Sequence, residues 1–232
     1  MLKSFKQYFR HQKLRSAGLV PKLDRETIAY GDRSGMWNCI VDILPQKPIV
    51  YSFGVGNNIA WDLQMVNLHN AELHAFDPTP RSVKWMEKQQ LPHGFQFHPT
   101  GLSNHNGTME FFVPRKSHKV NYSSIKVSNP EAETVSCPVK RFDTIADELG
   151  HTAIDILKMD IEGGEMEALP DILNSGIPVG QILAEFHYHY PAIEWGDFTD
   201  VMEMLNQKGY DIFHISERGY EISLVSRSLV ES

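Results

Sequence analysis

From residue 48 onward, short apolar runs alternate with segments of helical periodicity, and no other feature constrains the fold as strongly. Residues 48–53 (PIVYSF) and 154–159 (IDILKM) have the length and apolar character of buried strands. Strands that alternate with helices form right-handed βαβ units, which build a parallel sheet covered by helices on both faces. The sequence therefore predicts an α/β protein. Further strands are expected at residues 72–76, 95–98, 135–140 and 181–186, and helices at 59–68, 81–90, 143–149 and 198–207.

Two features of the second half of the chain refine this prediction. Residues 210–215 and 220–225 flank a Glu-Arg-Gly turn and are expected to form a hairpin, whose last strand runs antiparallel at the edge of the sheet. The helix that follows Gly163 and Gly164 contains Pro170. Because proline removes a helical hydrogen bond, Pro170 is expected to interrupt this helix or to restart it.

The first 47 residues are predicted to form a helical extension that packs on the core, ahead of a domain that spans residues 48–232. The chain begins with several basic residues, and no acidic residue occurs before Asp24. Leu2, Phe5 and Phe9 lie at roughly helical spacing, which indicates a short amphipathic helix. We favour an interpretation in which this helix packs on the domain and its basic face is solvated. Contact with an anionic surface is the alternative.

Composition is typical of a single globular domain and excludes several functions. The 232 residues fit one domain, and the hydrophobic fraction of 41% is close to the globular average of about 45–50%. With 22 basic and 29 acidic residues the net charge is −7, so a basic footprint for nucleic acid is absent. No apolar run approaches the roughly 18–20 residues that span a bilayer, and the first residues lack the apolar core of a secretory signal. Cys39 and Cys137 form no close pair and suit a reduced compartment, so a cytoplasmic location is expected.

A cofactor site is predicted where the first two strands end. Gly54 and Gly56 follow the first strand and open a helix, so the backbone there is able to approach a ligand closely. Asp77 ends the second strand about 20 residues later, where an acidic side chain accepts hydrogen bonds from ribose hydroxyls. The two features together indicate an adenosine-containing cofactor. A dinucleotide site would need a third glycine at the position of Ile59.

Residues 155–165 (DILKMDIEGGE) resemble the signature of the FkbM family of S-adenosylmethionine-dependent methyltransferases, and the resemblance covers roughly residues 48–190. It implies a class I methyltransferase fold, which is Rossmann-like and has a mostly parallel seven-stranded sheet with an antiparallel last strand. It also implies S-adenosylmethionine as the cofactor and methyl transfer mostly to hydroxyl oxygens of sugars or small metabolites. The supporting motifs are, in chain order, the G-x-G turn at 54–56, HAFDPTP at 74–80, LSNHNGTMEFF at 102–112, RFDTI at 141–145 and AEFHYH at 184–189.

The resemblance further implies which residues contact the cofactor. Asp77 matches the acidic residue at the ribose, and the loop at residues 100–103 would lie beside the adenine. Two positions depart from the first motif, because Ser52 replaces a common acidic residue and Asn58 replaces a common third glycine. Asp62 is a candidate substitute for the missing acid, but we expect it to be an exposed acid in the first turn of a helix. The expected cofactor-binding residues are Gly54, Gly56, Asn58, Asp77, Gly101, Leu102 and Asp160.

The expected catalytic residues follow two neighbouring strands. Asp160 and Glu162 stand at the end of one strand, and Glu185 and His187 at the end of the next. Parallel pairing of the two strands would bring these side chains together over the cofactor. An alcohol acceptor must lose its proton, and a histidine or a carboxylate performs this step. We expect His187 to be the general base, oriented by Glu185 or Asp160, and Glu162 to hold the acceptor or the loop.

Other polar residues nearby receive simpler interpretations. His189 is expected to be a surface loop residue, and Glu165 a charge at the start of a helix. The acidic and histidine side chains offer ligands for Mg²⁺, a cation that prefers oxygen. We do not favour a metal, because the sequence contains no tight ligand motif.

Three functions are consistent with the sequence. We favour an S-adenosylmethionine-dependent O-methyltransferase that acts on a small-molecule or glycan acceptor. An oxidoreductase that binds NAD or another nucleotide is disfavoured by Ile59, the chain length and the terminal hairpin. A non-catalytic relative that serves as a binding module is the third, because Ser52 and Asn58 alter the first motif. The sequence defines neither the acceptor nor the oligomeric state, for which a homodimer is one alternative.

Overall fold

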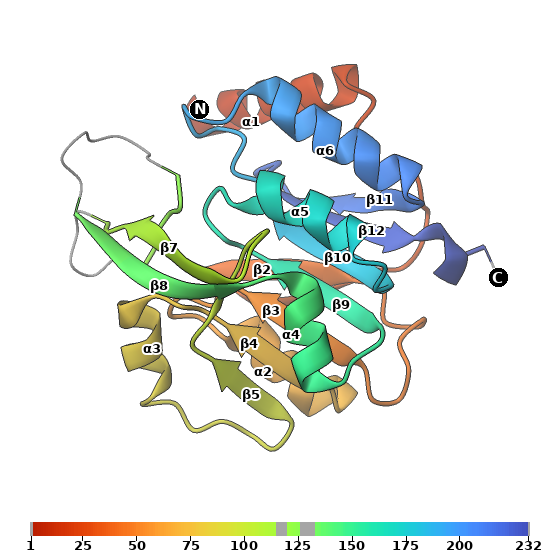
Figure 1. Ribbon diagram of the computed structural model, residues 1–232. Helices are drawn as coiled ribbons and strands as arrows, with labels where there is room; N and C mark the ends of the chain where they lie inside the picture. The colour runs from red at the N-terminus through yellow and green to blue at the C-terminus, as the bar shows by residue number, and fades with distance from the viewer. Residues whose placement is uncertain (1, 115–119, 126–132, 232) are drawn as a thin grey trace.

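The computed structural model of the protein describes residues 2–114, 120–125 and 133–231, and residues 2–4 through their backbone alone. A seven-stranded sheet forms the centre of this described chain (Figure 1). Its strand order is β11-β12-β10-β9-β3-β4-β5. The strands are β3 (Ile49–Phe53), β4 (Glu72–Phe76), β5 (Phe95–His98), β9 (Ile154–Met159), β10 (Val179–Glu185), β11 (Tyr210–Ile215) and β12 (Glu221–Ser226).

The sheet is parallel except at β12. Strands β5, β4, β3, β9 and β10 pair in parallel, whereas β12 pairs antiparallel with both β10 and β11. The predicted class I methyltransferase sheet with an antiparallel last strand is therefore confirmed. The expectation that the last strand lies at the edge was wrong, because β12 is inserted between β10 and β11. Its Ile222, Leu224 and Val225 are at most 1% exposed, which is the burial of an inner strand.

Helices cover both faces of the sheet (Figure 1). Apolar side chains of α4 (Phe142–Leu149), α5 (Glu165–Asn174) and α6 (Trp195–Gln207) build the core on one face, and those of α2 (Ala60–His69) and α3 (Pro80–Met86) the core on the other. Pro170 lies inside α5, so the predicted interruption was wrong. The neighbouring Leu169 and Ile172 are fully buried in the core, and this packing holds the helix together across the missing hydrogen bond.

A second, three-stranded sheet lies beside the first. Among the described residues it contains β6 (Gly101–Leu102), β7 (Gly107–Phe112) and β8 (Thr134–Lys140). Strand β8 lies between the other two. The strand predicted at residues 135–140 therefore forms, but as part of this smaller sheet. Its Met109 and Phe111 face the pocket described below.

The N-terminal extension is only partly helical. Helix α1 (Leu2–Ser16) is followed by a hairpin of β1 (Ile28–Asp32) and β2 (Gly35–Cys39), so the expected helical character was wrong for residues 28–39. The side-chain amide of Gln181, on a central strand, bonds both backbone groups of Ile40 at 2.9 and 2.8 Å. These buried bonds attach the extension to the sheet.

Helix α1 packs beside α6 (Figure 1). Leu14 is 1% exposed, and the Lys13 ammonium lies 3.8 Å from the ring centre of Trp195 at the start of α6. Phe5, Tyr8 and Phe9 nevertheless remain 56–65% exposed. One part of α1 thus packs on the domain, while an aromatic part faces solvent.

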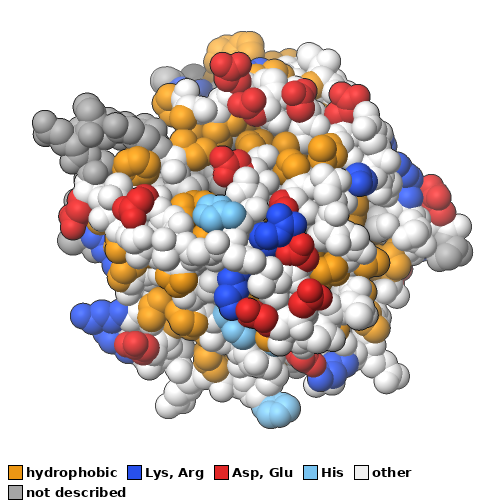
Figure 2. All heavy atoms as spheres, viewed as in Figure 1, with side chains coloured by type: hydrophobic (Ala, Val, Ile, Leu, Met, Phe, Trp, Pro, Cys, Tyr) orange, Lys and Arg blue, Asp and Glu red, His pale blue; other side chains and the backbone are white. Residues whose placement is uncertain are grey.

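The surface carries both signs of charge. On the face shown in Figure 2, acidic side chains lie along the upper edge of the molecule, above α6, and basic and acidic groups are interspersed below. Among the described residues, no helix is both long and apolar enough to cross a membrane. Cys39 and Cys137 are both buried free thiols.

Candidate active site

A pocket of about 420 Å³ opens where β3, β4 and β9 end, at the carboxyl edge of the parallel strands. Ligands of open α/β sheets bind at this edge because the loops there are free to vary while the strands hold them in place. The pocket's lining includes every residue that the sequence assigned to the cofactor: Gly54, Gly56, Asn58, Asp77, Gly101, Leu102 and Asp160.

The glycine turn after β3 is packed against the loop after β9. Gly54 has a φ of 79°, and a Cβ atom there would lie 1.7 Å from the carbonyl oxygen of Asp160. No side chain larger than hydrogen fits this position without moving the Asp160 backbone. Gly56 also has a positive φ, 55°, and its N–H donates to the Asp77 carboxylate at 2.9 Å.

Asp77 connects the glycine turn to α3. Besides the bond from Gly56, it accepts bonds from the backbone N–H of Thr79 at 2.9 Å and from the Thr79 hydroxyl at 2.7 Å. The residue is 5% exposed, and this burial raises the pKa of its carboxyl group above the ordinary value. A carboxylate has about four acceptor sites, so capacity for a ligand hydroxyl remains. Contact between Asp77 and a ribose stays a prediction.

Asn58 fastens the N-terminal hairpin to the pocket. Its side-chain N–H groups donate to Asp32 at 3.0 Å and to Ser34 at 2.7 Å, and its carbonyl oxygen accepts from the N–H of Ala60 at 2.9 Å. These three bonds give a structural reason for asparagine where glycine is common. Ser34 itself lines the pocket, so this hairpin forms part of the wall.

Behind the pocket, carboxylates surround the buried ring of His187. Its Nδ1 lies 2.9 Å from Glu165, while its Nε2 lies 3.5 Å from Glu162, 3.8 Å from Asp160 and 4.0 Å from Glu185. The four residues expected to be catalytic therefore do come together. Of these, Asp160 and Glu162 line the main pocket, whereas Glu185 lines a smaller cavity of about 80 Å³ and is ion-paired with Arg218 at 2.8 Å.

Glu165 is the residue that the sequence interpretation missed. It is 0% exposed, and the same oxygen that contacts His187 also accepts bonds from the N–H groups of Ile161 and Gly163, both at 3.2 Å. The expectation of a simple helix-start charge was wrong. A glutamate that directly follows the glycine pair of the active-site loop was the signal available in the sequence.

The protonation state of this cluster differs from the expected one. Burial by itself lowers the pKa of His187, but the hydrogen bond and charge of Glu165, together with Asp160 and Glu162, raise it to about 10. The ring is then a cation at neutral pH. A neutral His187 poised as general base is not favoured by this geometry, and Glu165 rather than Glu185 or Asp160 orients its Nδ1.

Asp160 is the better placed base. Burial, followed by the charge of Glu185, raises the pKa of the Asp160 carboxyl group above its usual range. Its Oδ1 is buried with no hydrogen-bond partner among the described residues, yet the side chain as a whole is 30% exposed. The carboxyl group therefore reaches both the cluster and the open pocket, and because its pKa is raised, its ionised form binds a proton more strongly than an ordinary aspartate does.

Glu162 shapes the loop between these groups. It adopts a left-handed backbone conformation with φ of 51°, which costs about 1–3 kcal/mol for a residue other than glycine. Asn121 and Tyr190 donate hydrogen bonds to its carboxylate, and the Ser123 hydroxyl donates to its carbonyl oxygen at 2.6 Å. These contacts hold the strained conformation beside the pocket.

Asp160, Glu185 and His187 also offer ligand atoms within 4.8 Å of one another. The view from the sequence, which does not favour a metal, stays a prediction for this cluster.

Ser52, which departs from the first motif, and Asp62, its candidate substitute, are both buried. Ser52 is fully buried, and its hydroxyl accepts a bond from the Lys158 ammonium on the neighbouring strand at 3.3 Å. Asp62, expected to be exposed, is 0% exposed, so that expectation was wrong. It lines the smaller cavity, as Lys158 does, and both of its carboxylate oxygens are buried with no hydrogen-bond partner among the described residues.

Fold and site together define an S-adenosylmethionine-type methyltransferase domain. Residues 50–212 match the family model of the FkbM methyltransferase domain, and the chain belongs to this family. Two relatives are named probable methyltransferase-like protein 24. The rat protein is 24% identical over 205 residues, which cover 84% of this chain and 49% of that protein. The human protein is 24% identical over 176 residues, which cover 71% and 42%. The chain thus spans about half the length of the relatives it matches.

Two solved structures show a more distant similarity to this chain. In a fibrillarin/Nop5p complex, the matching chain has a TM-score of 0.46 and 10% identity, with 79% of this chain and 74% of that chain covered. A precorrin-6y C5,15-methyltransferase from Geobacter metallireducens has a TM-score of 0.42 and 13% identity, with 79% and 83% covered. At these TM-scores the likeness says nothing about what this chain methylates.

Proposed function

We propose that this protein uses S-adenosylmethionine to methylate a hydroxyl oxygen of a sugar or another small metabolite. The observation that carries the proposal is the position of Asp160, whose carboxylate borders both the cofactor pocket and the buried His187 cluster. The lining suits the cofactor, because it contains Asp77 as an acid for the ribose and the tight glycine turn at Gly54 and Gly56. The pocket volume is within the usual range of about 300–1,000 Å³ for ligand sites.

When bound, the cofactor supplies an electrophilic methyl group. The chain's own residues must then align the acceptor and remove its proton. As the new O–CH₃ bond forms, the S–CH₃ bond of the bound sulfonium would break and leave a neutral thioether. At the same time the acceptor O–H bond breaks, and its proton passes to the Asp160 carboxylate. The His187 cation, held by Glu165, keeps the neighbouring carboxylates in place and balances their charge. Glu162 is suited to hold the acceptor, because its carboxylate lies at the pocket wall.

Calorimetric titration and a methyl-transfer assay test the proposal together. We expect the wild-type protein to bind S-adenosylmethionine and S-adenosylhomocysteine, and Asp77→Ala to lose this binding. Radiolabelled methyl transfer to a panel of hydroxylated sugars and small alcohols then identifies acceptors. We expect Asp160→Asn to keep cofactor binding and to lower kcat by roughly 10²–10⁴-fold, the usual contribution of a general base.

Asp200→Asn is the matched control, because Asp200 is an exposed aspartate on α6. It should leave both binding and turnover unchanged. Binding of NAD alone would overturn the cofactor assignment, and methylation of amines without any alcohol would overturn the O-methyl assignment. An unchanged rate in Asp160→Asn would remove Asp160 from the proton transfer.

The remaining expectations about partners stay predictions. The solvent-facing Phe5, Tyr8 and Phe9 on a basic helix support contact between α1 and an anionic surface. Co-sedimentation with anionic but not neutral vesicles is the measurement that decides this. Sedimentation velocity decides between monomer and homodimer, and two buried free thiols support the proposed reducing, cytoplasmic setting.

A further inference from the structure

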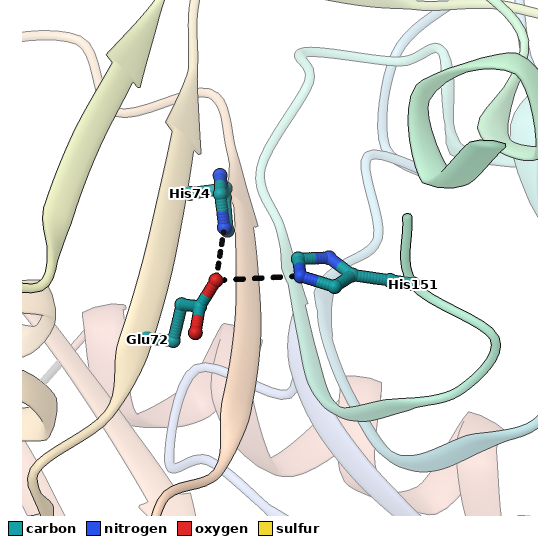
Figure 3. Close-up of side chains that lie close together, drawn as sticks. All are labelled: Glu72, His74 and His151. Atoms are coloured by element: carbon teal, nitrogen blue, oxygen red, sulfur yellow. Dashed lines mark ion pairs between the residues drawn. The ribbon is translucent and has the colours of Figure 1, made fainter. Parts of the chain in front are cut away.

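Two histidines and a glutamate converge beside the first half of β4 (Figure 3), whereas the pocket lies beyond the last residue of that strand. Glu72 begins β4, and His74 follows two residues later, so both side chains point to the same face. His151 comes from the turn between α4 and β9. Three side chains that are able to bind a metal ion, from two separate segments, thus meet at a place that the methyl-transfer reaction does not use.

The spacing of the three groups suits a tetrahedral metal ion. The Glu72 Oε1 atom lies 3.5 Å from the Nε2 of His74 and 3.4 Å from the Nε2 of His151. Zinc–ligand bonds of about 2.0–2.1 Å place two tetrahedral ligands about 3.4 Å apart. All three ligand atoms lie within 4.8 Å of one another, so one small ion is able to contact them together after a slight contraction.

The other ring nitrogens have the partners that metal-bound histidines usually have. The Nδ1 of His74 lies 3.0 Å from the Nε2 of His98, and the Nδ1 of His151 lies 2.9 Å from the Tyr51 hydroxyl. When each Nδ1 carries the proton and donates it to this partner, each Nε2 has a free lone pair directed at Glu72. Such outer contacts fix the tautomer and orientation of a histidine ligand.

An unsatisfied atom points into this cluster. The His74 side chain is 2% exposed, and its Nε2 is buried with no hydrogen-bond partner among the described residues. The Lys47 ammonium donates a hydrogen bond to the Glu72 Oε2 atom at 2.5 Å, which leaves Oε1 for a ligand.

We propose that Glu72, His74 and His151 bind one zinc-class divalent cation. Two imidazole nitrogens and one carboxylate oxygen form a set of ligands that binds zinc in preference to magnesium or calcium. The Glu72 side chain is 27% exposed and the His151 side chain 10%, so water from the surface is able to supply a fourth ligand. The ion would join the start of β4 to the turn before β9, and so act as a structural clamp remote from the pocket.

Calorimetry with ZnCl₂ and visible spectroscopy with CoCl₂ test this site on metal-free protein. We expect one equivalent of Zn²⁺ to bind, and Co²⁺ to show the intense visible bands of a tetrahedral complex. Tyr51→Phe removes only an outer contact and should weaken Zn²⁺ binding by about 10–100-fold. His151→Ala removes a ligand and should weaken Zn²⁺ binding by more than Tyr51→Phe does. Glu72→Gln provides a second ligand variant, with a side chain of unchanged size.

Two variants make the result specific. His93→Ala removes an exposed histidine outside the cluster and should leave Zn²⁺ binding unchanged. His187→Gln should also leave it unchanged, which separates this site from the carboxylate cluster at the pocket. The proposal is overturned if wild-type protein binds no Zn²⁺, if His151→Ala and Glu72→Gln bind as tightly as wild type, or if binding disappears only in His187→Gln.

Discussion

Replacing Gly54 by alanine tests how closely the glycine turn and the loop after β9 are packed. Two costs arise. A φ of 79° is unfavourable for alanine by roughly 1–2 kcal/mol. In addition, the new Cβ would lie 1.7 Å from the carbonyl oxygen of Asp160, whereas ordinary contact begins at 3.4 Å. The backbone of Asp160 must therefore move, and overpacking of this kind costs about 1–3 kcal/mol or more.

Gly176→Ala is the matched control. Gly176 has nearly the same φ, 80°, but a Cβ atom there meets nothing within 4 Å. Both variants carry the conformational cost, so the difference between them isolates the contact with Asp160. We expect Gly54→Ala to lose about 2–5 kcal/mol of unfolding free energy and Gly176→Ala about 1–2 kcal/mol.

Urea unfolding followed by circular dichroism measures these losses, and calorimetry measures cofactor affinity in the same samples. Because natural domains have about 5–15 kcal/mol of stability, Gly54→Ala should still fold at low temperature. We expect it to bind S-adenosylmethionine much more weakly than wild type, while Gly176→Ala binds normally. Equal stability losses in the two variants, with normal affinity in Gly54→Ala, would refute the packing argument.

Two further predictions concern the His187 cluster. Glu165→Gln removes the carboxylate charge beside Nδ1, so NMR titration of the His187 ring should show a pKa lower than that of wild type; an unchanged pKa would mean that Glu165 does not hold the proton there. The folded pKa of about 10 exceeds the unfolded value of about 6.5, so the contribution of His187 to stability is fully present below about pH 6.5 and is lost as the pH rises through about 10. The difference in unfolding free energy between wild type and His187→Gln should therefore shrink between those pH values, and a constant difference would contradict the assignment.

Local patterns in the sequence were sufficient for the central sheet and for several residues that line the pocket at its carboxyl edge. The strand at residues 154–159 was predictable because six residues with a buried strand's character stand between a helix and a glycine pair. The positions of Gly54 and Asp77 followed from turn chemistry at strand ends, and the structure places both in one pocket. In each case the deciding interaction lies within a few residues or is fixed by parallel pairing of neighbouring strands.

Other features depended on contacts that no local pattern encodes. The hairpin at residues 28–39 is stabilised by packing on α2 and by the bond between Asn58 and Asp32. Asp62 has the sequence position of a solvated helix acid, yet its helix turns that side toward the core, where Asp62 lines the smaller cavity. Insertion of β12 between β10 and β11 likewise depends on which strand of the hairpin pairs with β10.

The amino-acid sequence by itself determined the α/β class, the chain order of the strands and helices of the central sheet, and the residues that gather at its carboxyl edge, because hydrophobic periodicity and turn residues act over short stretches of chain. Only the tertiary structure decided what those residues are chemically. The charge on His187, the burial of Glu165 and the convergence of Glu72, His74 and His151 depend on distances across the fold, since burial and neighbouring charges set the pKa and the ligand geometry of each group.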